Sequence, residues 1–210
     1  MMKLGSKTLE DWGIVTGFKI GEPPIRERFY EVPGRHGKID ATDALTGYPI
    51  LDNRPVSITL FIKRTTAKEY QEVYDDIYKT CHGEVLPFVL DFDEGYYYEG
   101  RWKVSPSQEN LSCGKVILSS SCYPYALKNE LTVVDISSPT GEEREVVLLN
   151  AGMPTTLYVE TNAEITIKRG DTTKKYDGIT EITLPLLIKD EVITVSGIAD
   201  AKIYYQEGKK

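Results

Sequence analysis

The chain is poor in the side chains that most often perform catalysis or bind metals. Its 210 residues include two histidines, His36 and His82. No Gly-x-Ser-x-Gly, Gly-x-x-x-x-Gly-Lys-Ser/Thr or His-Glu-x-x-His pattern occurs, and no cysteine pair has zinc-ligand spacing. His36 follows turn residues, which favours a solvated loop, and His82 stands where a predicted helix ends. We therefore expect no enzyme, no cofactor and no metal site.

Long apolar runs and an export signal are also lacking. No stretch approaches the ~20 apolar residues that span a bilayer, which argues against a membrane partner. Residues 1–7 have neither an apolar core nor a cleavage site, so no secretory signal is predicted. The odd number of cysteines (Cys81, Cys113 and Cys122) then indicates reduced thiols. These absences predict synthesis in the cytoplasm.

Concentrated positive charge is missing from the sequence as well. The net charge is −7, from 25 basic and 32 acidic residues. Residues 1–130 carry 16 basic and 19 acidic residues, and residues 131–210 carry 9 and 13, so both parts are acidic. No basic cluster stands out, which argues against a surface for gripping phosphate.

The residues that are abundant favour a mainly β protein. Tyrosine occurs 14 times, and Val, Ile and Thr recur in short blocks between Gly, Pro, Asn and Asp. We predict strands at 54–63, 85–92, 96–104 and 114–122, and a hairpin turn at Asp93-Glu94-Gly95. A short strand is expected around Leu9-Glu10-Asp11-Trp12-Gly13.

One amphipathic helix is predicted at about 66–82. Thr66 and Glu69 have the spacing of a capping box, and Gly83 stands where the helix should end. One apolar stripe follows at helical spacing: Tyr70, Val73, Tyr74, Ile77, Tyr78 and Cys81. Such a stripe most often packs on a sheet as core, and a subunit contact is the alternative.

The segment from residue 22 to residue 55 interrupts this pattern. Pro33, Gly34, Gly37, Gly47 and Pro49 punctuate a stretch with few apolar runs. A loop of this length inside a compact domain is uncommon unless it is functional or packs on a neighbour. We predict an arm or hairpin that reaches another subunit, with candidate contact residues Pro33, Gly34, Arg35, His36, Gly37 and Tyr48.

An aromatic cluster provides the second candidate interface. Tyr96-Tyr97-Tyr98 is followed by Arg101-Trp102, and alternation sends Tyr97 to the face opposite Tyr96 and Tyr98. Tyr, Trp and Arg are enriched at protein interfaces. We expect one face of this strand to be core and the other to meet a partner, with Tyr97, Arg101 and Trp102 as candidates.

After residue 130 the composition changes, because residues 131–210 contain no Trp, Cys, Phe or His. Short strands are predicted at 131–136, 144–149, 155–160, 164–168, 180–184, 191–196 and 201–206, with turns that include Arg169-Gly170-Asp171 and Asp177-Gly178. This spacing is typical of a β-sandwich. We predict two domains, residues 1–130 and 131–210.

The order of these features resembles the distal tail (Dit) proteins of long-tailed phages. The features are the loop Val32-Pro33-Gly34-Arg35-His36-Gly37, the strand 54–63, the helix 66–82, the hairpin ending Tyr96-Tyr97-Tyr98-Glu99-Gly100-Arg101, and the segment Cys122-Tyr123-Pro124-Tyr125-Ala126. The Asn150-Ala151-Gly152 turn and the closing segment 201–208 fit the second domain of that family. Each motif is short, and their order is the specific part.

The resemblance implies an N-terminal β-sandwich or split-barrel domain with one helix and a galectin-like C-terminal β-sandwich. It implies a homo-hexameric ring at the virion tail tip, synthesised in the host cytoplasm. The implied partners are the tail tube protein, the tape measure protein and a tail-tip or receptor-binding protein. DNA would pass through the lumen without specific binding, and an acidic lumen would suit this passage.

Two other functions remain open from the residues. A carbohydrate-binding module for bacterial surface glycan would need exposed aromatic side chains on a sandwich face. A tail-tip cell-wall hydrolase would need a catalytic constellation, which the shortage of His and Cys disfavours. The galectin-like label refers to fold only, and residues 131–210 lack the Trp and His of a galectin-type sugar site.

Overall fold

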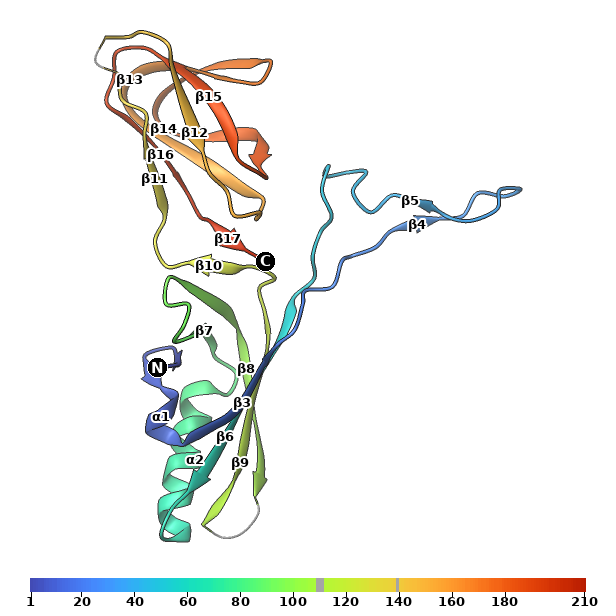
Figure 1. The fold of residues 1–210 in the computed structure, drawn as a ribbon, viewed down its shortest axis with the longest axis vertical. Helices are drawn as coiled ribbons and strands as arrows, with labels where there is room; N and C mark the ends of the chain where they lie inside the picture. The colour runs from blue at the N-terminus through green and yellow to red at the C-terminus, as the bar shows by residue number, and fades with distance from the viewer. Residues whose placement is uncertain (109–111, 139) are drawn as a thin grey trace. The chain divides into compact units, whose positions relative to one another are not determined.

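The computed structural model describes residues 1–108, 112–138 and 140–210, and only the backbone of residues 107, 108 and 183–186. The chain divides into two units, Met1–Pro124 and Tyr125–Lys210. This division lies six residues before the predicted boundary at 130. Both units are built mainly of strands (Figure 1), so the mainly β fold class is confirmed.

The first unit contains seven strands in one antiparallel sheet, a separate hairpin and two helices. The strands are β1 (Lys3–Leu4), β2 (Lys7–Thr8), β3 (Ile14–Ile20), β4 (Phe29–Tyr30), β5 (Ile39–Asp40), β6 (Arg54–Lys63), β7 (Val85–Val89), β8 (Tyr96–Gln108) and β9 (Cys113–Cys122). The helices are α1 (Leu9–Trp12) and α2 (Ala67–Cys81). The sheet has the order β2-β1-β7-β8-β9-β6-β3, and β4 and β5 form a separate two-stranded sheet.

Alternation along β6 decides which face of this sheet is covered. Val56, Ile58, Leu60 and Ile62 are buried, whereas the residues between them are partly exposed. Helix α2 packs against β8 and β9 on the buried side and contributes Tyr70, Ile77 and Cys81 to the core. The other side of the strands, which we call the open face, has no such cover within the described part of this unit.

The predicted helix is confirmed almost to the residue. Thr66 is the N-cap, and its hydroxyl accepts the backbone N–H of Glu69 at 3.2 Å. The carboxylate of Glu69 accepts from the backbone N–H of Thr65 at 3.1 Å, one residue before the donor that a capping box uses. The predicted stripe is only half core, since Tyr78 remains 43% exposed.

The second unit begins with β10 (Ala126–Lys128) and ends with β17 (Gly208–Lys209), which pair with each other. Between them lies a curled sheet of six strands: β11 (Thr132–Asp135), β12 (Arg144–Leu148), β13 (Thr155–Arg169), β14 (Thr172–Leu187), β15 (Glu191–Ser196) and β16 (Ala201–Tyr205). The order is β11-β16-β13-β15-β12, with β14 on β13 and β17 on β10. Strand β13 pairs with β16 through 158–161 and with β15 through 166–168. One long strand therefore connects the two halves of the sheet.

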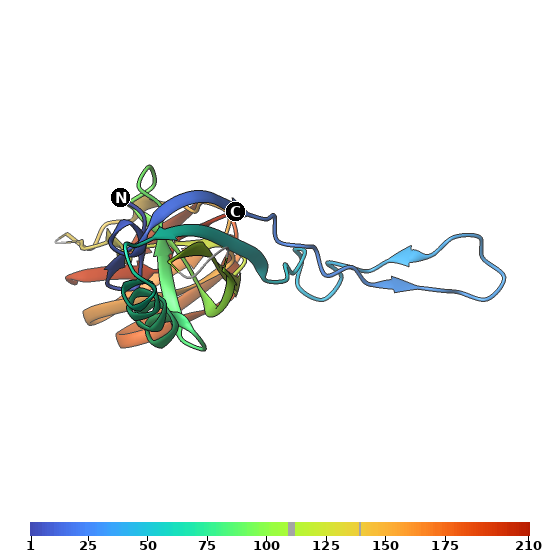
Figure 2. The same ribbon diagram turned by 90° about the horizontal axis from the view of Figure 1, so that it is seen from below.

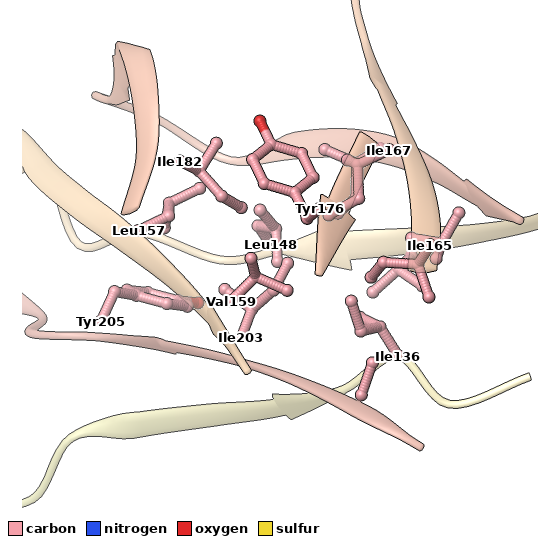
Figure 3. Close-up of a cluster of buried hydrophobic side chains, with 14 of the residues drawn as sticks. Ile136, Leu148, Leu157, Val159, Ile165, Ile167, Tyr176, Ile182, Ile203 and Tyr205 are labelled. Carbon is pink, nitrogen blue, oxygen red and sulfur yellow. The ribbon is translucent and has the colours of Figure 1, made fainter. Parts of the chain in front are cut away.

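Figure 3 shows the apolar core of the second unit, where side chains of β12, β13, β14 and β16 meet. Its buried members include Ile136, Leu148, Leu157, Val159, Ile165, Ile167, Tyr176, Ile182, Ile203 and Tyr205. The Tyr205 hydroxyl donates to the carbonyl oxygen of Leu149 at 2.7 Å. Burial, as the largest effect, raises the pKa of Tyr205 to about 12. The tyrosine therefore stays neutral, with its one polar atom bonded.

Three predictions about local structure were wrong. The segment around Leu9 is a turn of helix rather than a strand. The predicted strands 155–160 and 164–168 are one strand, and the predicted turn at Asp177-Gly178 lies inside β14. Between the pairs Thr161–Gly178 and Ile165–Tyr176, β13 has two more residues than β14. Turn residues at that position therefore mark a bulge, where the ladder is irregular but continues.

Candidate subunit interface

Residues 21–53 form a hairpin that leaves the sheet after β3 and returns into β6; we call it the arm. Figures 1 and 2 show it as a separate two-stranded element. Phe29 pairs with Asp40 and Tyr30 with Ile39, and an isolated bridge joins Ile25 to Leu51. The predicted loop is thus an ordered hairpin, held mainly by its own backbone.

Local polar contacts fix the hairpin along its length. The guanidinium of Arg26 forms an ion pair with Asp52, at 2.5 Å between Nη2 and Oδ1. Nearer the tip, Lys38 pairs with Glu31 at 3.0 Å. The Asp40 carboxylate accepts from the backbone N–H and the hydroxyl of Thr42, and these bonds lower the pKa of Asp40. All of these groups remain largely exposed, so they define the shape of the hairpin more than its stability.

The arm has no core of its own, because none of its residues is buried. Five of its large apolar side chains are between 42% and 81% exposed: Ile25, Phe29, Tyr30, Val32 and Leu45. A two-stranded hairpin alone is marginally stable in water. Apolar side chains gathered on such an element indicate a surface that another molecule covers.

The predicted contact residues of the arm lie mostly at its tip. Pro33, Gly34, Arg35, His36 and Gly37 form the turn between β4 and β5, and all five are exposed. Gly34 and Gly37 have φ of +80° and +79°, a region that favours glycine. Tyr48, by contrast, is partly buried on the returning segment, where the Thr46 hydroxyl donates to its carbonyl oxygen. The tip and Tyr48 therefore do not form one site.

The second predicted cluster, on β8, is divided between the two sides of the sheet. Trp102 is fully buried, and its indole N–H donates to the carbonyl oxygen of Leu86 at 3.0 Å. Its ring meets Phe88 edge to face at 5.9 Å. The assignment of Trp102 to a partner-facing surface was therefore wrong, because the residue belongs to the core of the first unit.

Tyr97 and Arg101 occupy the opposite side of β8. Arg101 is exposed, and its guanidinium donates to the carbonyl oxygen of Gly83. Tyr97 is partly buried, and burial raises the pKa of its hydroxyl. Parity along β8 explains the burial of Trp102, since residue 102 shares its side of the strand with Tyr98. Tyr98 is buried, and its ring centre lies 5.2 Å from the Arg54 guanidinium.

The two histidines lie in different parts of the first unit. The His82 ring stacks on Tyr78 at 4.4 Å, and its Nδ1 accepts the backbone N–H of Val104 at 3.2 Å. His36 is exposed at the arm tip. Across the described ranges, no group of three His, Cys, Asp or Glu side chains could hold a metal ion.

The cysteines and the helices were also considered as places for a reactive thiol or a membrane span. All three cysteines are thiols, and burial raises the pKa of Cys81 to about 12, which disfavours a reactive thiolate. None of the helices in the described residues has the length and apolar character needed to cross a bilayer. Two surfaces of the first unit are exposed in the described residues: the apolar side chains of the arm and the open face.

Comparison with known proteins connects this fold with one solved structure. No family model matches the sequence, and no curated protein matches it either. The chain is similar to a crystal structure of the SPP1 Dit protein, gp 19.1, described as a paradigm of the hub adsorption apparatus in phages that infect Gram-positive bacteria. The similarity has a TM-score of 0.69 at 13% identity and covers 100% of this chain and 98% of that chain. The chain therefore has the fold of the SPP1 Dit protein.

Proposed function

We propose that this protein is a structural component of a phage tail tip. It forms a hub, as a homo-hexameric ring, between the tail tube and the tail-tip or receptor-binding apparatus. The observation that most supports this role is the full-length similarity to a hub protein. The arm, which has no buried residue, agrees with it. A virion location follows from the same proposal.

The arm accounts for how such a ring closes. It belongs to one copy and needs an apolar surface on a different part of another copy, which makes the contact heterologous. Repeated head-to-tail contacts of this kind close into a ring when the rotation between copies allows it. Covering Phe29 and Tyr30, which are 49% and 58% exposed, would supply part of the driving force.

The tape measure protein, the tail tube protein and a receptor-binding protein are the proposed partners. A non-enzymatic role agrees with the histidine geometry, because His82 accepts a backbone N–H and stacks on Tyr78. Support for a purely structural role also comes from the solved hub structure, whose description refers to adsorption.

Light scattering of the purified full chain tests the ring. We expect a particle mass six times the 23.7 kDa of one chain, and we expect it across a range of protein concentrations. A second sample should contain the other tail-tip proteins, because some rings close only during assembly. A mass of one chain in both samples would contradict the proposal.

A further inference from the structure

The open face of the first unit concentrates positive charge that is dispersed in the sequence. Strands β3, β6, β8 and β9 together contain six basic residues and one acidic residue, Glu99. Five of the six lie on the open face by strand register, and all five are exposed: Lys19, Lys63, Arg101, Lys103 and Lys115. The sixth, Arg54, points to the buried side. The whole chain, by comparison, carries a net charge of −7.

Register places two of these lysines in one row across four strands. Lys103 lies opposite Ser119 on β9, Ser119 opposite Ser57 on β6, and Ser57 opposite Lys19 on β3. Three strand spacings separate the ends of the row, which is about 14 Å between backbones. That span is close to the width of the DNA major groove, about 12 Å. Hydroxyl groups fill the space between the two cations.

In the described residues, the two lysines of this row, Lys19 and Lys103, are not paired with carboxylates of the same chain. Within the described ranges, neither Lys19 nor Lys103 forms an ion pair, whereas Lys7, Lys38, Lys68 and Lys175 each do. Ser121 and Pro55 continue the face beside Arg101, and Thr59 lies opposite Ile117. The face thus presents ammonium, guanidinium and hydroxyl donors, together with the apolar Phe61 and Ile117 and one carboxylate, Glu99.

We propose that this face contacts the phosphate backbone of duplex DNA, weakly and without reading its sequence. Lysine, arginine, serine and threonine are the side chains that donate to phosphate oxygens. Lysine and serine are depleted in the cores of protein interfaces, which disfavours burial of this face by another copy. The choice of DNA among polyanions rests on the proposed role in a phage tail, whereas the basic face itself does not.

The contact is electrostatic and therefore sensitive to salt. Each phosphate that a cation neutralises contributes about 0.9 to the slope of log affinity against log salt. If Lys19, Arg101 and Lys103 all engage, the slope is about −3. Affinity then falls roughly 40-fold between 50 and 200 mM salt. A contact of this kind would hold DNA transiently while allowing it to move.

Fluorescence anisotropy with a labelled duplex of about 20 base pairs tests the proposal on the full chain. The double variant Lys19→Gln/Lys103→Gln should bind at least about 10-fold more weakly in 50 mM NaCl, and its salt slope should be shallower by about 1.8. The matched control is Lys68→Gln/Lys79→Gln, which makes the same charge change on exposed residues of α2. The control should bind like the wild type.

Several results would overturn the proposal. These are the absence of binding by the wild type in 50 mM NaCl, equal losses in both double variants, and tighter binding to polyglutamate than to DNA of equal charge. A changed particle mass in the Lys19→Gln/Lys103→Gln variant would also overturn it, because the face would then be a subunit contact. Failure of DNA binding leaves the ring mass unaffected, so the two proposals can fail separately.

Discussion

The arm and the second unit differ in how many side chains they bury. The second unit buries one large apolar cluster, and its long strands supply both halves of the sheet that encloses the cluster. The arm, which runs from residue 21 to residue 53, has no buried side chain. The second unit therefore has a hydrophobic core of its own. The arm has backbone pairing but no enclosed side chains. This difference is the basis of our proposal that another molecule covers the arm.

The largest effect is expected from a cavity in the second unit. Leu148→Ala should lower the free energy of unfolding by about 3–4 kcal/mol, because Leu148 is fully buried among the other members of the cluster. Urea titration followed by far-ultraviolet circular dichroism measures the loss. Val147→Ala, next to it but 54% exposed, is the control and should change stability by less than about 0.5 kcal/mol. Equal losses of stability in the two variants would contradict the assignment of Leu148, and not Val147, to the core.

The buried hydroxyl of Tyr205 tests how much one hydrogen bond contributes to the core of the second unit. Tyr205→Phe removes the donor to the Leu149 carbonyl oxygen and should cost about 1 kcal/mol in the same titration. Tyr158→Phe serves as the control, because Tyr158 is 47% exposed on the same unit. A neutral result at Tyr205 would show that the core tolerates the loss of its bonded polar atom.

Alkaline pH tests the same residue in the intact core. Because the pKa of Tyr205 is raised from 10.0 to about 12, its neutral form is favoured in the folded state. The resulting stability is complete below pH 10 and is lost as the pH rises from 10 towards 12. Between pH 9 and 11 we expect the wild type to lose about 1 kcal/mol more than Tyr205→Phe. Identical pH profiles would argue that Tyr205 ionises normally in the folded protein.

The smallest effect on chain stability is expected in the arm. Phe29→Ser/Tyr30→Ser should change the free energy of unfolding of the dissociated chain by less than about 0.5 kcal/mol, since neither side chain is buried. Thermal unfolding at low protein concentration, where assembly is disfavoured, measures this. A loss of the size that core truncations cause, several times larger, would show that the arm is part of the core of its own chain.

The sequence was informative where a single periodicity determined the structure. The capping pair Thr66 and Glu69 located α2, and the alternation from Val56 to Ile62 located β6 with its buried side. The arm was recognised from its prolines and glycines, because such a segment cannot continue a strand of the sheet. These features are local, so neighbouring residues were sufficient to predict them.

Features that depend on pairing between distant strands could not be predicted from the sequence. Lys19 and Lys103 are far apart in the chain, and only the order β8-β9-β6-β3 brings them into one row. Counting charges along the chain therefore could not reveal the basic face. The residue Trp102 was misplaced for a different reason: its type is common at interfaces, but its parity on β8 directs it into the core.

The proposed ring depends most on whether the arm joins copies of this chain. The direct measurement is the mass of Phe29→Ser/Tyr30→Ser by light scattering, beside the wild type and the control Val147→Ser/Ile179→Ser. The control changes two side chains that are 54% and 78% exposed on the second unit. We predict the mass of six chains for the wild type and the control, and single chains of 23.7 kDa for the arm variant. An arm variant that keeps the mass of the wild-type ring would contradict the account.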